Sequence, residues 1–490
     1  METGAEETQF SPEPHQPPSP SASPVRRVPW TAVVAWIVIL AVVAAAILSH
    51  SQRTAEPDSE SGAALTIRDE TLVIGKILVG ASQILDGWNA FLAGQLQPLA
   101  EGNVSDRICR AILIGELLGA SEAIDEIPSI LDSQRGSSPE VVSPEVAQLI
   151  DHVTAALQDR IASAPALPSV AEHDRKHLRS ELGWYAELLL HPPESSNAAA
   201  RQELVAPLPG FVYRLISIGS LYIVSFLAGL AGIVALIVVA STRGLRHRFR
   251  DSSRSGPIYA ETFALWVVVF SVLQVGLSSV NWGECRLVAS MVVSVISLGA
   301  LFWPVLRGIP LRAMLSDIGL SLNPEPFRHV LSGCLGFGMG LVMAGIGLLM
   351  FAGLRQIELH FQPDAPSPTH PIVSLYAGST ISTIIQLFIL AAVVAPISEE
   401  IMFRGVLYRH LRDATGRLGL IPSFLVSACG TSIVFAAVHP QGWTFIPVLA
   451  ALAITFSFLR EWRGSLLPGM IAHGLQNAIT VTLGMTVLGG

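Results

Sequence analysis

Residues 30–48 read WTAVVAWIVILAVVAAAIL, a run of 19 residues without a charged side chain. Such a run is close to the ~20 residues that a helix needs to cross the ~30 Å hydrocarbon core of a bilayer. A signal peptide has a shorter apolar core of ~7 to 15 residues, and this run follows a long acidic, proline-rich segment. The sequence therefore predicts an uncleaved helix that anchors the chain in a membrane.

The same apolar character extends over most of the chain. Of its 490 residues, 51% are hydrophobic and only 14% are charged, whereas ordinary soluble proteins carry about 25% charged residues. The predicted fold class is therefore all-α, a polytopic transmembrane helix bundle of about nine spans. The further spans are expected at about 211–240, 258–280, 287–306, 328–352, 373–397, 420–438, 444–459 and 465–488.

Two segments do not have the composition of a membrane span. Residues 1–29 are rich in Pro, Ser and Glu, and we expect a disordered tail because such a segment has too little apolar surface to bury. Residues 50–208 carry mixed charges and repeat apolar residues at steps of three and four, which is typical of amphipathic helices. They are predicted to form an inserted, extracytoplasmic helical domain, in which we find no pattern of catalytic or metal-binding residues.

Basic residues indicate the orientation of the chain. Arg26 and Arg27 precede the first span, and the basic cluster RGLRHRFRDSSR follows the second at 243–254. Because cytoplasmic loops are enriched in Lys and Arg, both signals place the N-terminus in the cytoplasm and residues 50–208 outside it. With a net charge of −8 and no basic face, the chain is not expected to bind nucleic acid.

Small and sulfur-containing residues have structural interpretations. The four cysteines are scattered without a CxxC pair, so neither a disulfide framework nor a thiolate metal site is predicted. Gly336 and Gly340 form a GxxxG motif within a glycine-rich span, which predicts close packing between helices.

Three short sequences place polar residues in this apolar frame: ISEEIMFRGVLYRH (397–410), FAAVHP (435–440) and AHGLQNA (472–478). An ionisable residue at the centre of a bilayer costs about 2.5 to 3.5 kcal/mol on insertion scales, so it persists where it faces a cavity or a partner. Each motif alone has a simpler interpretation as a helix end at the membrane surface. Their combination predicts a functional site.

The two adjacent glutamates are predicted to differ in role. On a helix Glu399 and Glu400 point about 100° apart, and Glu400 reaches Arg404 at i, i+4 in the favourable acid-first order. We expect Glu400 and Arg404 to neutralise each other, which leaves Glu399 as a general base for water.

Two histidines and an amide complete the predicted set. His439 shares a helix face with Phe435, and His473 and Asn477 project together at i, i+4. A carboxylate, two imidazoles and an amide from three helices supply the groups needed to add water to a peptide carbonyl.

These motifs resemble those of a known family. EEIMFR is similar to the EExxxR motif, FAAVH to FxxxH and HGLQN to HxxxN of the CPBP family, which contains the type II CAAX prenyl endopeptidases and bacterial relatives linked to bacteriocin processing and immunity. The resemblance covers about residues 310–490, an intramembrane catalytic domain that follows the transmembrane helices of 211–306.

The resemblance implies an intramembrane endopeptidase that cuts a membrane-tethered, CAAX-like or prenylated protein or peptide. In that case Glu399 and His439 activate water, while His473 and Asn477 stabilise the oxyanion or complete a metal site. The residues leave metal use open, because Glu399, His439 and His473 are suitable zinc ligands but the chain has no HExxH motif and Asn is an uncommon ligand. We favour water activation without a metal. The absence of organelle signals fits a bacterial inner membrane.

The predicted spans give Glu399 and His439 conflicting depths. Simple span boundaries put Glu399 near the cytoplasmic end of one span and His439 near the outer end of the next, ~30 Å apart at ~1.5 Å per residue. We expect the glutamate helix to run on through Arg409, which places Glu399 deeper, and the next helix to begin outside the hydrocarbon or to tilt strongly. A non-catalytic membrane scaffold is the alternative function; a transporter is less expected, because the two halves show no internal repeat.

Overall fold

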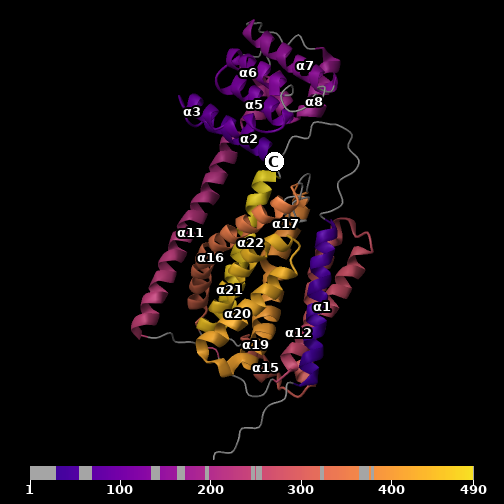
Figure 1. Ribbon diagram of the computed structural model, residues 1–490, viewed down its shortest axis with the longest axis vertical. Coiled ribbons are helices and arrows are strands. Elements are labelled where there is room, and N and C mark those ends of the chain that lie inside the picture. The colour runs from indigo at the N-terminus through magenta and orange to yellow at the C-terminus, as the bar shows by residue number, and fades with distance from the viewer. Residues whose placement is uncertain are drawn as a thin grey trace, which may run out of the picture.

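The computed structural model describes residues 29–53, 69–133, 144–162, 171–193, 198–243, 249, 256–320, 325–363, 375–376 and 380–488. The predicted disordered tail and most of the basic cluster after the second span lie outside these residues. Over the described residues the fold is helical throughout, with a membrane bundle capped at one end by a smaller group of helices (Figure 1). The fold class predicted from the sequence is confirmed.

The smaller group, here called the cap domain, lies between the first and second spans in sequence. Its helices are α2 (Asp69–Ser82), α3 (Asn89–Gly94), α4 (Gln97–Ala100), α5 (Val104–Leu117), α6 (Ala120–Ser133), α7 (Pro144–Ile161), α8 (Glu172–Leu182), α9 (Trp184–Leu190) and α10 (Ala198–Val205). Helix α5 is its centre, with ten buried residues and a capping box in which Asn103 and Asp106 satisfy each other's backbone N–H groups. The domain has a hydrophobic core of its own, separate from those of the membrane bundle.

The membrane bundle contains the remaining helices. They are α1 (Trp30–Arg53), α11 (Leu208–Arg243), α12 (Ile258–Ser278), α13 (Arg286–Ser297), α14 (Phe302–Leu306), α15 (Leu311–Ile318), α16 (Pro326–Phe361), α17 (Ile381–Ile389), α18 (Ala395–Glu399), α19 (Tyr408–Thr415), α20 (Leu420–Ala437), α21 (Ile446–Arg463) and α22 (Leu467–Leu488). Within the described residues, eight helical stretches are long and apolar enough to cross a membrane. Helix α22 is as long as a span and packs on α16 and α21, but polar residues such as His473 and Asn477 lower its hydropathy.

The segment that carries the glutamates is longer than its apolar part predicted. Helical structure is continuous from Ile381 to Leu418, a 38-residue stretch, rather than ending near residue 397. At 1.5 Å per residue this stretch is about 57 Å long, so Glu399 lies near its middle. The predicted continuation through Arg409 is confirmed, and it removes the conflict between the depths of Glu399 and His439.

Glycines set the closest helix approach in the bundle. A Cβ atom added at Gly229 of α11 would lie 2.0 Å from the carbonyl carbon of Gly338 in α16. Gly336, from the predicted GxxxG motif, instead packs against the side chain of Leu459 in α21. The motif therefore marks close packing as predicted, but the backbone-to-backbone contact is made by Gly338, which lies between the two glycines of the motif.

This contact gives the first testable expectation. Gly229→Ala inserts a methyl group against backbone that cannot rotate away, and overpacking of this kind destabilises proteins by about 1–3 kcal/mol. We expect the variant to unfold at a clearly lower temperature in detergent. Gly219→Ala on the same helix is the matched control, because its Cβ meets no atom within 4 Å. Equal unfolding temperatures for the two variants would contradict this account of the α11–α16 contact.

Candidate active site

A proline widens the helix that carries the site. Pro396 has no N–H to donate to the preceding turn, and its ring crowds the carbonyl four residues earlier. The helix takes up this defect by adopting π-helical geometry over Leu390–Val394, and it is π-helical again over Glu400–Leu407. Single π turns within α-helices are frequent at functional sites.

Helix α22 is fitted to the first widened turn. The Nδ2 of Asn477 donates to the carbonyl oxygen of Ala391 at 2.8 Å. Gly474 allows close approach, since a Cβ there would lie 2.7 Å from the carbonyl oxygen of Ala392. The HGLQN sequence thus holds α22 against the defect that Pro396 creates, which fixes the position of His473 relative to the glutamates.

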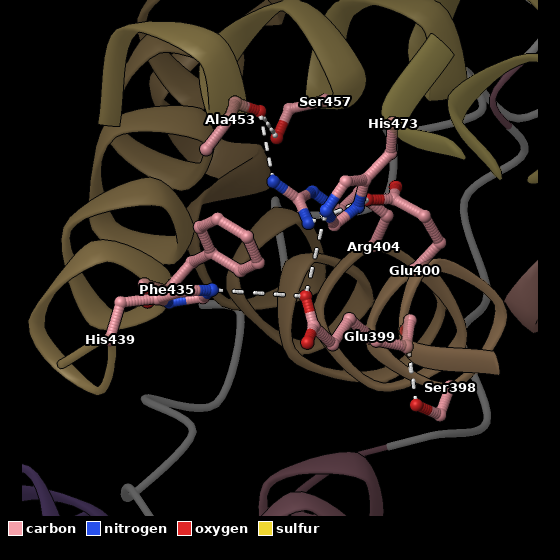
Figure 2. A network of polar contacts seen from close by, with 10 residues as sticks. Ser398, Glu399, Glu400, Arg404, Phe435, His439, Ala453, Ser457 and His473 are labelled. Carbon is pink, nitrogen blue, oxygen red and sulfur yellow. Dashed lines mark hydrogen bonds and ion pairs between the residues drawn. The ribbon is translucent and has the colours of Figure 1, made fainter. Parts of the chain in front are cut away.

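Glu399 faces both predicted histidines (Figure 2). Its Oε2 lies 4.0 Å from the Nε2 of His439 and 3.7 Å from the Nε2 of His473. The Glu399 side chain is about 24% exposed, and its Oε2 is buried without a hydrogen-bond partner among the described residues. The structure therefore brings together Glu399, His473 of α22 and His439, which lies two residues beyond the end of α20.

The hydrogen bonds of the Nδ1 atoms determine which ring nitrogen of each histidine carries the proton. The Nδ1 of His439 lies 2.6 Å from the carbonyl oxygen of Phe435, which only accepts, so this nitrogen carries the proton. The Nδ1 of His473 lies 3.1 Å from Oε1 of Glu400, the ionised partner of Arg404, and likewise donates. In their neutral forms both Nε2 atoms then present lone pairs toward Glu399. Glu399 Oε2 and the two Nε2 atoms are then all hydrogen-bond acceptors, so they can be bridged only by a group that donates. A water molecule is such a group, because it has two O–H bonds.

The ion pair predicted between Glu400 and Arg404 is present. Arg404 Nη1 donates to Glu400 Oε1 at 2.8 Å, and the two side chains are 1% exposed or less. The sequence did not predict that the same carboxylate oxygen also accepts from His473. Glu400 therefore has a second task, which is to hold the His473 ring and fix its tautomer.

Aromatic rings enclose the Arg404 guanidinium. Its central carbon lies 4.6 Å from the ring centroid of Phe435 and 5.1 Å from that of Phe456, and Nη2 donates to the carbonyl of Ala453 at 3.3 Å. Phe456 also stacks on His473, with centroids 5.0 Å apart. Phe435 belongs to the FxxxH motif, but Phe456 and Ala453 carry no sequence signal because they sit in an ordinary apolar run.

The protonation of His439 follows from its surroundings. It lies in the loop between the α20 and α21 spans. Burial lowers the pKa of His439 from its ordinary value of 6.5, and the negative charge of Glu399 only partly opposes this shift. His439 is therefore neutral at pH 7, as a group that holds water through a lone pair must be.

The predicted metal ligands do not have the spacing of a metal site. Ligand atoms ~2.0–2.1 Å from one zinc ion lie about 3.3–3.4 Å apart in a tetrahedral site. Here Oε2 of Glu399 is 4.0 and 3.7 Å from the two imidazole nitrogens. Across the part of the chain that the structure describes, no group of three or more His, Cys, Asp or Glu side chains has the geometry to hold a metal ion. The spacing in this structure is wider than that around a bound zinc ion, and the mechanism proposed below is written without a metal.

Comparisons with known proteins agree with the motifs. Residues 381–479 match the family model described as type II CAAX prenyl endopeptidase Rce1-like. The chain is 27% identical over 121 residues to the membrane-embedded CAAX protease MroQ of Staphylococcus aureus (strain USA300), a match that covers 22% of this chain and 48% of that protein. The chain thus spans about half the length of the curated relative it matches. No solved structure matches it.

Proposed function

From the premise that its C-terminal part is a CPBP-type domain in a multi-pass bacterial membrane protein, we propose that this chain is an endopeptidase that hydrolyses a membrane-associated substrate at Glu399. The observation that carries the proposal is the convergence of Glu399 Oε2 with the Nε2 atoms of His439 and His473. If these motifs were only helix ends at the membrane surface, there would be no reason for the three side chains to converge.

In the proposed reaction, water lies between these three acceptors. It donates one hydrogen to Glu399 and the other to an imidazole Nε2, which leaves an oxygen lone pair for attack. As the oxygen bonds to the peptide carbonyl carbon, Glu399 takes the proton. A base held within reach of the attacking water contributes typically 10²–10⁴-fold to the rate.

Collapse of the tetrahedral intermediate then breaks the C–N bond. The proton on Glu399 passes to the leaving nitrogen, which departs as an amine while the acyl part becomes a carboxylic acid. Each proton and electron pair is accounted for, and Glu399 returns to its starting form.

His473 and Asn477 are the two candidate donors to the oxyanion. A neutral His473 presents a lone pair from Nε2, so it serves the water, and it donates to an oxyanion only when it carries a second proton. Asn477 uses one N–H on Ala391 and keeps a second. Its observed contact positions α22, and its role as an oxyanion donor stays a prediction.

For the substrate, the position of the site within a membrane-spanning stretch supports a peptide or protein tethered to the bilayer. The matched relative is named as a CAAX protease, and a CAAX-like or prenylated peptide is the first substrate class to test. A membrane scaffold that keeps the fold without catalysis is the alternative.

The proposal predicts two results with purified protein in detergent, incubated with a panel of CAAX-type, farnesylated and plain membrane peptides. His439→Ala is expected to lower cleavage by roughly 10²-fold, whereas His360→Ala, an exposed histidine at the end of α16, leaves it unchanged. A chelator is expected to have no effect.

Other outcomes of this assay are equally informative. Loss of cleavage on chelation, restored by zinc, would replace the metal-free mechanism. No cleavage of any peptide by the wild type would favour the scaffold, whereas equal cleavage by wild type and His439→Ala would remove His439 from the mechanism.

A further inference from the structure

The depth of the site in the bilayer follows from α16, which is long enough to cross the whole membrane. Arg328 and Arg355 flank a run without Asp, Glu, Lys or Arg over 329–354. At 1.5 Å per residue this run is about 39 Å long, enough to cross the ~30 Å hydrocarbon core of a bilayer. The two arginines therefore lie near the two surfaces of the membrane.

The loop that carries His439 lies close to one of these arginines. Phe445, the last residue of that loop before α21, packs on Phe351 of α16 with ring centroids 5.5 Å apart. Phe351 is about one helical turn, or 6 Å, from Arg355, whereas Arg328 lies about 35 Å away along the helix. The loop of His439 is therefore near the membrane surface that Arg355 marks.

Helix α20 gives the same result from the opposite end. Arg412 donates to the hydroxyl of Ser423 near the start of α20, and His439 lies two residues beyond its end. At 1.5 Å per residue, His439 is about 24 Å from Ser423 along the helix axis. Arg417 and Arg463 lie at the same end of the bundle as Ser423. The site is therefore separated from this basic end by most of the thickness of the hydrocarbon core.

The surface near the site is the one that the cap domain covers, here called the cap side. Thr482 and Thr486, near the end of α22, line a cavity together with Trp184 of the cap domain. Figure 1 shows the cap domain over the end of the bundle where α17 lies, with α19 at the opposite end. Trp443, in the loop of His439, is 46% exposed, as expected for a tryptophan at a membrane surface.

The two ends of the bundle differ in charge. The loops and helix ends away from the cap domain carry basic side chains, among them Arg307, Arg312, Arg417 and Arg463. The loop over 438–445, near the site, has no charged residue in its sequence. Because Lys and Arg gather in cytoplasmic loops, this difference favours a cap side that faces away from the cytoplasm.

We propose that the cap side is the outer face of the membrane, and that the substrate is a membrane-anchored chain whose scissile bond lies within about two helical turns, ~11 Å, of that face. Such a bond occurs in the last turns of a membrane-spanning helix or directly after it, and its hydrolysis releases a peptide on the outer side. A lipid-anchored tail on the cytoplasmic face lies across a ~30 Å hydrocarbon core from the site and cannot reach Glu399. The choice of substrate rests on the proposed function, whereas the depth of the site does not.

Depth and orientation are measured without catalysis, on the full chain in intact bacterial cells, with a membrane-impermeant maleimide and peptide mass spectrometry. Trp443→Cys should be labelled in intact cells, whereas Arg417→Cys, exposed at the other end of α20, should be labelled only after permeabilisation. The native Cys429 of α20 is exposed on the bundle between these positions and should stay unlabelled in intact cells, because lipid covers it. Labelling of Arg417→Cys alone in intact cells, or of neither variant, would overturn the proposal.

The substrate is tested with two fusions of one single-span membrane anchor to the peptide that the purified protein cuts fastest. One fusion carries the peptide at the outer end of the anchor and the other at the cytoplasmic end. Only the outer fusion should be cut, by the wild type and not by Glu399→Gln. Cutting of the cytoplasmic fusion, alone or equally with the outer one, would overturn the proposed substrate. If neither fusion is cut although the labelling is as expected, the substrate fails together with the proposed function and the depth of the site stands.

Discussion

Glu399→Gln is expected to lower peptide cleavage by at least about 10²–10⁴-fold, the contribution typical of a positioned general base. Glutamine has nearly the same volume as glutamate and cannot accept the proton of water at neutral pH. Its amide N–H groups can also donate to the Nε2 atoms of His439 and His473 in place of the water. The variant is therefore expected to lose the bound water but to keep the packing of the site. The measurement is single-turnover cleavage in H₂¹⁸O, in which wild type places one ¹⁸O atom in the new carboxyl group.

The control separates catalysis from folding. Glu284→Gln changes an exposed glutamate between α12 and α13 and is expected to match the wild type in rate and in unfolding temperature. Glu399→Gln should match it in unfolding temperature alone. If Glu399→Gln cleaves at the wild-type rate with normal ¹⁸O incorporation, Glu399 is not the base and the proposed mechanism is wrong.

The fold could largely be predicted because a bilayer imposes a simple rule on sequence. Uncharged runs of about 20 residues identify spans whatever their tertiary contacts. The rule failed where a span continues through charged residues, as it does from Glu399 to Arg412. The cost of those charges is offset by partners on other helices, such as Glu461 for Arg412, at 2.8 Å. Such partners cannot be read from the sequence of the span itself.

The motifs predicted which residues gather but not how each is held. Glu400 and Arg404 are four apart on one helix, so their pairing follows from local geometry. The contact of Asn477 with Ala391 depends on the π-helical turn before Pro396. No local sequence pattern predicts that turn. The position of Phe456 against Arg404 is set by packing between helices far apart in sequence.

Arg404→Met is expected to produce the largest loss of stability at the site. It leaves Glu400 as a buried charge whose remaining hydrogen-bond donor is His473, and removal of one partner of a buried ion pair destabilises by about 3–5 kcal/mol. It also removes the cation enclosed by Phe435 and Phe456, although the methionine chain keeps part of the packing. Thermal and denaturant unfolding in detergent would measure the loss, with the exposed Arg417→Met on the same stretch of helix as the control.

A double-mutant cycle tests whether the pair serves stability or catalysis. Glu400→Gln combined with Arg404→Met removes both charges, so the double variant should be more stable than the sum of the single losses predicts, by about 1–3 kcal/mol. It should nevertheless cleave far more slowly than wild type, because a neutral amide at position 400 no longer fixes the His473 tautomer as the carboxylate does. Recovery of stability without recovery of rate would identify Glu400 as a positioning residue for His473. Recovery of both would mean that the pair only balances charge, and that His473 is held by its stacking on Phe456.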